Sequence, residues 1–184
     1  MDSDLIILPG IGGSGDEHWQ QIWKRRGLVG PDFEPASWEH PDLDDWIGAL
    51  ECAVNKATQP PVLVAHSLAC LLVAHWAARD GRGVAGAFLV AVPDPKGRRF
   101  PRAAATFIDV PAGRLPFPAL VVASADDPYG GLDHGKRRAA DWGAGFVVVG
   151  AVGHINGDSG LGDWPIGAGL LEAFCAGAAA RRRA

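Results

Sequence analysis

Five short apolar segments recur along the chain, and stretches long enough for a helix separate them. Their residues are apolar at consecutive positions rather than at alternate ones, which is typical of strands buried on both faces of a parallel sheet. The segments are residues 5–8, 61–65, 84–92, 119–123 and 146–149. This pattern predicts a doubly wound α/β fold, with a mostly parallel sheet, helices on both faces and right-handed crossovers.

The whole chain, residues 1–184, fits one domain, because its length and its 48% hydrophobic content suffice for a single core. The Pro- and Gly-rich stretch 93–118 is expected to be a loop beside the site, and residues 177–184 a flexible, solvated tail. The segment 33–38 is a candidate for one more strand. Helices are expected at residues 16–26, 43–55, 67–79, 132–142 and 166–175.

Composition excludes several classes of function. A net charge of −4 and a pI near 5.8 argue against binding to nucleic acid or to an anionic membrane, since both favour basic surfaces. The chain has no positively charged signal segment and no run of roughly 20 apolar residues, so a cytoplasmic location is expected. Cys52, Cys70 and Cys175 are widely spaced, which favours reduced core residues over a metal site.

Polar residues follow directly after the apolar segments. In an open parallel sheet ligands bind at the carboxyl ends of the strands, so these positions are the candidates for a site. The most informative is Ser67, which follows the segment 61–65 and begins a predicted helix. Ala65 and Ala69 flank it at the positions where a sharp strand-to-helix turn needs small residues, usually glycine. Ser67 is therefore interpreted as a nucleophile, although a serine in this place can also simply cap a helix.

A nucleophilic serine needs a base, and His154 is the strongest candidate among the six histidines. It follows the last apolar segment, and the glycine beside it suggests an exposed loop. His66 is next to Ser67 but should point away from it at a sharp turn, whereas His75 is too far along the helix to reach and should be packed.

A carboxylate must orient the base, and Asp126 and Asp127 both follow the segment 119–123. The sequence pattern alone does not distinguish Asp126 from Asp127 as this carboxylate, and Asp94 is a third candidate. Serine, then aspartate, then histidine is the chain order of α/β hydrolases rather than of chymotrypsin or subtilisin.

An oxyanion also needs donors, and backbone N–H groups at two places are candidates. One belongs to Leu68, directly after Ser67, and the other to Ile11 or Gly12 in the glycine-rich loop after the first strand. Residues 10–15 also match the Gly-x-Gly-x-x-Gly pattern of dinucleotide-binding loops. That reading lacks a convincing acidic partner, for which Glu34 is the nearest candidate.

Several of these segments resemble a known family. Residues 5–19, 41–46, 65–70, 92–93, 124–129 and 153–156 are similar to the small serine hydrolases that include retinoblastoma-binding protein nine and the bacterial YdeN proteins. The resemblance covers nearly the whole chain. It implies a compact α/β-hydrolase fold with little or no lid, and it assigns Asp127, the second aspartate of Asp-Asp-Pro, to a triad with Ser67 and His154.

The expected reaction is therefore hydrolysis of a small-molecule ester, or an amide, through an acyl-enzyme, with no cofactor and no metal. A non-catalytic binding protein on the same fold and an acyltransferase are the alternatives. The sequence indicates no particular protein partner. Gly12, His66, Pro93 and Tyr129 are candidates for substrate binding. Trp19, Trp46 and Trp164 could line an acyl pocket but belong more often to a core.

Overall fold

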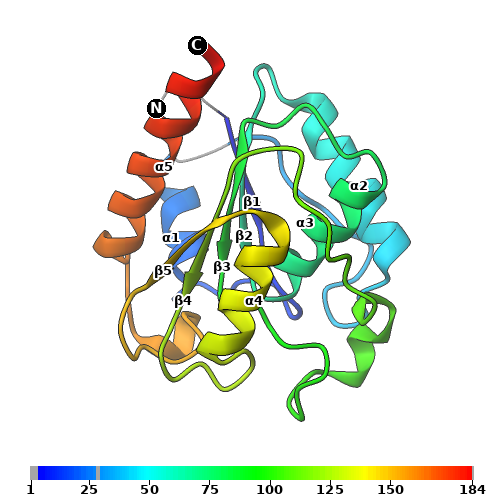
Figure 1. Cartoon of the computed structure of the whole chain (residues 1–184), viewed down its shortest axis with the longest axis vertical. Helices are drawn as coiled ribbons and strands as arrows, with labels where there is room; N and C mark the ends of the chain where they lie inside the picture. Colours follow the sequence, from blue (N-terminus) through cyan, green and yellow to red (C-terminus); the bar gives the residue numbers. More distant parts are fainter. Residues whose placement is uncertain (1–3, 28–29, 184) are drawn as a thin grey trace.

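A five-stranded parallel sheet forms the centre of the molecule. The computed structural model describes residues 4–27 and 30–183. The strands follow one another across the sheet in the order β1-β2-β3-β4-β5, as Figure 1 shows. The predicted parallel sheet is confirmed. The bounds of the strands are β1 Leu5–Leu8, β2 Val62–His66, β3 Gly86–Val90, β4 Ala119–Ala123 and β5 Gly145–Val148.

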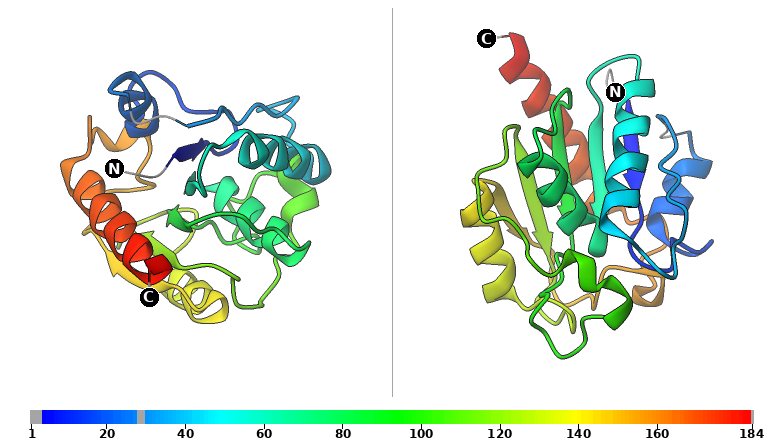
Figure 2. Two further views of the ribbon diagram at one scale, coloured as in Figure 1. Left: turned by 90° about the horizontal axis from the view of Figure 1, so that it is seen from above. Right: turned by 90° about the vertical axis from the view of Figure 1, so that its right-hand side faces the viewer.

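Helices cover both faces of this sheet, as predicted. Because the strands keep their sequence order, the crossover helices α2, α3 and α4 share one face, and α1 and α5 cover the other; Figure 2 shows the two layers. The bounds are α1 Trp19–Arg25, α2 Leu43–Lys56, α3 Leu68–Ala78, α4 Leu132–Trp142 and α5 Pro165–Arg183. Short 3-10 helices lie at η1 Arg102–Phe107 and η2 Gly157–Ser159.

Strand residues alternate between two apolar cores. Ile6 and Leu63 face the core under α2 and α3, whereas Leu5 and Val62 face the core under α1 and α5. Both faces of each inner strand are thus buried, which explains the consecutive apolar residues of the sequence. Nine successive residues of α3 are buried, because this helix packs against the sheet, α2 and η1. The nucleophile turn that precedes α3 is therefore held by the interior of the protein.

Segment 33–38 is not a strand, which corrects the sixth-strand prediction. Its apolar character comes from packing: Phe33 is buried and makes edge-on contacts with Trp38 and Trp46. Pro31 and Pro35 bracket that phenylalanine and lack the N–H groups that a sheet ladder needs. The segment anchors a loop to the core under α2.

Residues 177–183 are also different from the expectation of a flexible tail, because they form the last turns of α5 (Figure 1). Alanine has the highest helix propensity, and the alanines of residues 178–180 continue the helix. Ala178 is buried against the body of the protein. No helix in the described part of the chain has the length and hydropathy of a membrane span.

The cysteines divide between core and surface. Cys70 and Cys175 are buried as predicted, but Cys52 is exposed. It lies on α2 next to the exposed Glu51, while Leu50 and Ala53 of the same helix are buried in the core. The prediction of three core cysteines was wrong for Cys52, because composition does not define which helix face a residue occupies.

Candidate active site

Ser67 lies at a strained turn between β2 and α3. Its backbone has φ 54° and ψ −123°, a conformation that non-glycine residues rarely adopt. The Ser67 N–H donates to the carbonyl of Val90 at 2.9 Å, so the turn is tied to the neighbouring strand β3. The hydroxyl makes no capping hydrogen bond to α3. The interpretation of Ser67 as a simple helix cap is therefore wrong.

The glycine-rich loop after β1 lies against this turn. A Cβ on Gly10 would lie 3.0 Å from the Cβ of Ser67, so a larger residue there would force the two segments apart by a few tenths of an ångström. The N–H of Gly12 donates to the carbonyl of Trp38 at 2.9 Å. Gly12 is thus engaged elsewhere, and of the two candidates in this loop Ile11 keeps its place as an oxyanion donor. Leu68 begins α3, and the N–H groups in a first helical turn have no acceptor within the helix.

The three residues predicted to form a triad are hydrogen-bonded in a row. His154 Nε2 is 2.8 Å from Ser67 Oγ, and His154 Nδ1 is 2.9 Å from each carboxylate oxygen of Asp127. One of these oxygens, Oδ1, also accepts the N–H of Tyr129. All three side chains are buried, with relative exposures of 9% for Ser67, 8% for His154 and 7% for Asp127.

His154 is not in an exposed loop, which corrects the prediction made from its neighbouring glycine. Its ring lies between those of His66 and Tyr129, with centroid distances of 5.0 and 4.5 Å. The next residue, Ile155, is fully buried, and its carbonyl accepts the indole N–H of Trp19 at 2.8 Å. The loop is thus drawn into the protein by the core under α1.

The other two aspartates have different partners. Asp126 Oδ1 accepts from Ser124 Oγ and from the N–H of Gly153, both at 2.8 Å, and these hydrogen bonds lower the pKa of Asp126. Asp126 therefore holds the loop that carries His154. Asp94 lies instead beside His134, with 3.6 Å between Oδ1 and Nδ1. The structure thus places Asp127 against the imidazole, as the family resemblance implied.

Two further histidines adjoin His154. His66 points away from Ser67 as predicted, and its Nε2–H donates to the carbonyl of His154 at 3.0 Å. Burial holds the pKa of His66 well below its usual value. His18 is a residue that the sequence analysis missed. It caps α1 through Nδ1, which accepts the N–H of Gln20 at 3.2 Å, and its position just before a tryptophan-rich helix was the available signal. His75, by contrast, packs on α3 with its ring beside a carbonyl of η1.

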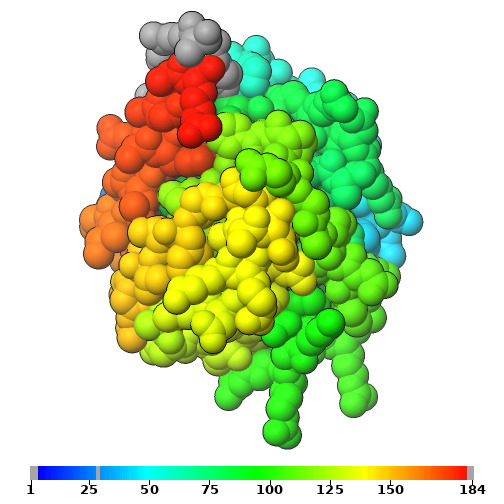
Figure 3. Space-filling model, viewed as in Figure 1, coloured from blue at the N-terminus to red at the C-terminus, as the bar shows by residue number. Residues whose placement is uncertain are grey.

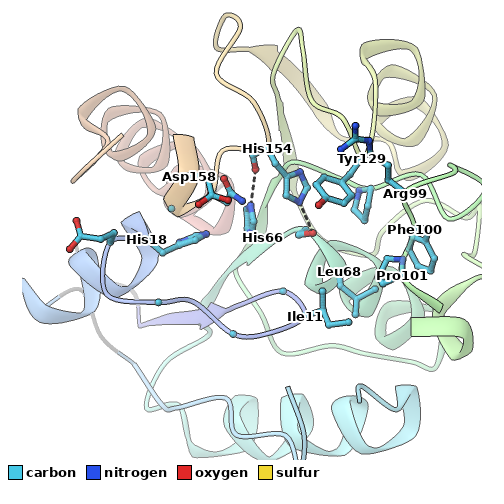
Figure 4. Close-up of a pocket in the computed structure, with 18 of the residues that line it drawn as sticks. Ile11, His18, His66, Leu68, Arg99, Phe100, Pro101, Tyr129, His154 and Asp158 are labelled. Atoms are coloured by element: carbon cyan, nitrogen blue, oxygen red, sulfur yellow. Dashed lines mark hydrogen bonds between the residues drawn. The ribbon is translucent and has the colours of Figure 1, made fainter. Parts of the chain in front are cut away.

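A cavity of about 670 Å³ opens over Ser67 and His154 (Figure 4). Of the predicted substrate-binding residues, His66, Pro93 and Tyr129 line it, as does Ile11. Gly12 does not, and its N–H donates to the carbonyl of Trp38 instead, so that prediction is corrected. The tryptophans proposed for an acyl pocket, Trp19, Trp46 and Trp164, are instead buried in the two cores. Lining residues that the sequence did not suggest are His18, Arg99, Phe100, Pro101, Asn156 and Asp158.

A family model described as serine hydrolase matches residues 5–173. The chain belongs to this serine hydrolase family. Among the described residues no group of three or more His, Cys, Asp or Glu side chains is arranged to hold a metal ion.

Solved structures support the same family and fold. A YdeN-like hydrolase from Pectobacterium atrosepticum is 33% identical, with a TM-score of 0.85 over 95% of this chain and 91% of that one. The YdeN gene product of Bacillus subtilis is 22% identical, with a TM-score of 0.78 over 94% and 98% of the two chains. These matches confirm the resemblance to the YdeN proteins and the compact α/β-hydrolase fold.

More distant structures share the fold alone. Est1E from Butyrivibrio proteoclasticus, solved with ferulic acid, is 14% identical, with a TM-score of 0.67 over 94% of this chain and 86% of that one. No curated protein matches this serine hydrolase significantly.

Proposed function

We propose that this serine hydrolase cleaves a carboxylic ester, or an amide, of a small molecule through an acyl-enzyme on Ser67. The observation that carries the proposal is the row of hydrogen bonds from Ser67 through His154 to Asp127, at 2.8 and 2.9 Å. Nucleophile and base within hydrogen-bond reach, with a third group on the far side of the base, are the arrangement that activates a serine hydroxyl.

The reaction has two halves. In the first, Ser67 Oγ attacks the carbonyl carbon while His154 Nε2 takes the hydroxyl proton; His154 then gives that proton to the leaving oxygen or nitrogen, and the acyl group stays on Ser67. In the second, water attacks the acyl-enzyme and gives its proton to His154, which returns it to Ser67 as the acid departs. Asp127 accepts the Nδ1–H bond, fixes the tautomer and stabilises the imidazolium.

Negative charge on the carbonyl oxygen needs donors that are already in place. The N–H groups of Leu68 and Ile11 are the proposed pair, and the positive end of α3 adds to them because Ser67 immediately precedes this helix. The contact between Gly10 and Ser67 keeps the loop of Ile11 close to the reacting atoms. A cavity of about 670 Å³ has the size of a small-molecule site.

A fluorophosphonate probe tests the proposal. We expect one covalent adduct per chain, found by mass spectrometry on the peptide that contains Ser67, and none with Ser67→Ala. Turnover of p-nitrophenyl acetate should disappear in the same variant. Absence of both labelling and turnover would indicate a binding protein, whereas ester products formed with added alcohol in preference to acid would indicate an acyltransferase.

A further inference from the structure

His18 holds an unused hydrogen-bond donor at one end of the cavity. Its Nδ1 accepts the N–H of Gln20, so the ring proton must be on Nε2. Burial, and then the nearby His154, lower the pKa of His18 to about 4, which keeps the ring neutral. Only 5% of the residue is exposed, and within the described part of the chain Nε2 has no hydrogen-bond partner.

A buried donor without a partner is costly, and neither capping of α1 nor the proposed reaction uses this one. The His18 ring meets that of His66 edge-on at 4.7 Å, and His66 in turn adjoins His154 at 5.0 Å. Figure 4 shows the three rings side by side along the cavity, with His18 at the end opposite Arg99 and Phe100. The donor is therefore one histidine removed from the proposed base.

The surrounding residues define what this donor can bind. Asn156 also lines the cavity; its carboxamide oxygen accepts from Ser159, which leaves its NH₂ group as a second donor. Two donors favour an oxygen acceptor. Glu17 and Asp158 also line the cavity, with Asp158 on the His18 side in Figure 4, and their negative charge disfavours an anion there. A neutral hydroxyl satisfies both conditions, because it accepts from His18 and can donate to a carboxylate.

We propose that His18 Nε2–H binds a hydroxyl group of the substrate and makes this enzyme selective for hydroxylated esters. The hydroxyl lies on the acyl or on the alcohol part of the ester. This inference rests on the proposed function and adds a specificity-determining residue to it.

Two pairs of esters test the selectivity, each with a hydroxyl replaced by a methyl group. The first is p-nitrophenyl β-hydroxybutyrate against p-nitrophenyl isovalerate, and the second is hydroxyethyl butyrate against propyl butyrate. We expect the wild-type enzyme to favour the hydroxylated member of at least one pair by about tenfold in kcat/KM, the value of one well-placed hydrogen bond.

Two substitutions separate capping from substrate binding. Asparagine in His18→Asn can still cap α1 from the position of Nδ1 but does not reach the position of Nε2, so the preference should fall to about onefold. Glutamine in His18→Gln places an amide donor near Nε2 and should keep most of the preference. His134→Asn is the matched control, because His134 Nε2 is also buried with no hydrogen-bond partner among the described residues, but His134 does not line this cavity.

The outcomes are distinct. Equal rates for both members of both pairs in an enzyme that is labelled at Ser67 would overturn the inference and leave the hydrolase proposal intact. The inference would also be overturned if His18→Asn kept the preference for the hydroxylated ester. It would be overturned as well if His18→Gln, which loses the helix cap, were the only variant to lose that preference. If His18→Asn does not fold, the test rests on two results: the wild-type preference for the hydroxylated ester, and whether His18→Gln keeps that preference. Absence of both labelling and turnover would overturn the hydrolase proposal and this inference together.

Discussion

The centre of the cavity and its outer wall are built in different ways. Ser67, Asp127 and His154 come from the ends of strands or from loops drawn into the core, and each is at least nine-tenths buried. The outer wall includes Arg99 and Phe100, from the long connection between β3 and β4. Long side chains from the green part of the chain, which includes this connection, project beyond the surface in Figure 3. The comparison indicates that the proposed catalytic groups are placed on buried segments, whereas the outer wall is placed on a more exposed loop.

The largest effect should come from the base. His154→Ala removes the group proposed to take the Ser67 proton, and removal of a triad member costs about 10⁴- to 10⁶-fold in kcat. The measurement is turnover of p-nitrophenyl acetate, with circular dichroism as a check of folding, since His154 is buried. His134→Ala should keep wild-type activity. The opposite pattern would assign the base to His134, which does not line the cavity, and would overturn the comparison.

The next effect separates two adjacent carboxylates. Asp127→Asn puts an amide beside Nδ1 and should lower kcat by about 10⁴-fold through the wrong tautomer. In Asp126→Asn the amide oxygen can still accept from Ser124 and Gly153, so the loss should stay below about tenfold. Both variants are compared by kcat at neutral pH. Equal losses would show that holding the loop matters as much as orienting the base.

How far the sequence predicts the site depends on how local each interaction is. The strands and Ser67 were predictable, because apolar runs and a small-residue frame are local patterns. The choice of Asp127 over Asp126 required the family resemblance, since it depends on the direction of each side chain as the chain leaves β4. The choice of Ile11 over Gly12 depends on a carbonyl of Trp38, which is distant in the sequence. His18 was missed for the same reason, because its burial and its neighbours are set by tertiary packing.

The pH dependence of stability should report the buried histidines. Burial, followed by His154, lowers the pKa of His18 from 6.5 to about 4. Between these values the unfolded chain binds a proton that the folded chain does not, so stability falls as pH decreases from 6.5 to 4. His18 alone contributes a loss of about 3 kcal/mol. The pKa of His66, His75 and His134 is also lowered, so their contributions have the same sign.

Urea unfolding at several pH values measures this effect. His18→Asn should reduce the slope of the unfolding free energy against pH by about 1.4 kcal/mol per pH unit near the middle of the window. An unchanged slope would mean that His18 binds a proton in the folded protein as readily as in the unfolded chain. The His18 end of the cavity would then be less shielded from water than its burial indicates.

A smaller effect should follow from crowding the nucleophile turn. Gly10→Ala places a Cβ 3.0 Å from the Cβ of Ser67, so the loop or the turn must shift by a few tenths of an ångström. Small displacements of reacting groups are costly, and we expect about a tenfold loss in kcat with folding retained. Gly48→Ala on α2 is the control, because among the described residues no atom outside its own stretch of helix backbone lies within 4 Å of its Cβ position. Full activity in Gly10→Ala would show that the turn at Ser67 tolerates movement. The centre of the cavity would then differ less from the outer wall than the comparison implies.

The smallest effect is expected at the outer wall. Arg99 is exposed, and none of the ion pairs in the described part of the chain includes it, so its charge acts across water on whatever enters the cavity. Charges in that environment interact weakly and are screened by salt. Arg99→Ala should therefore change kcat/KM for a neutral ester by less than about threefold and leave the thermal midpoint unchanged. For an ester that carries a carboxylate, the wild-type rate should fall with added salt and the variant's rate should not. A loss above tenfold on the neutral ester would place Arg99 with the centre of the cavity, because an exposed guanidinium that only attracts anions has no means of accelerating the hydrolysis of an uncharged substrate.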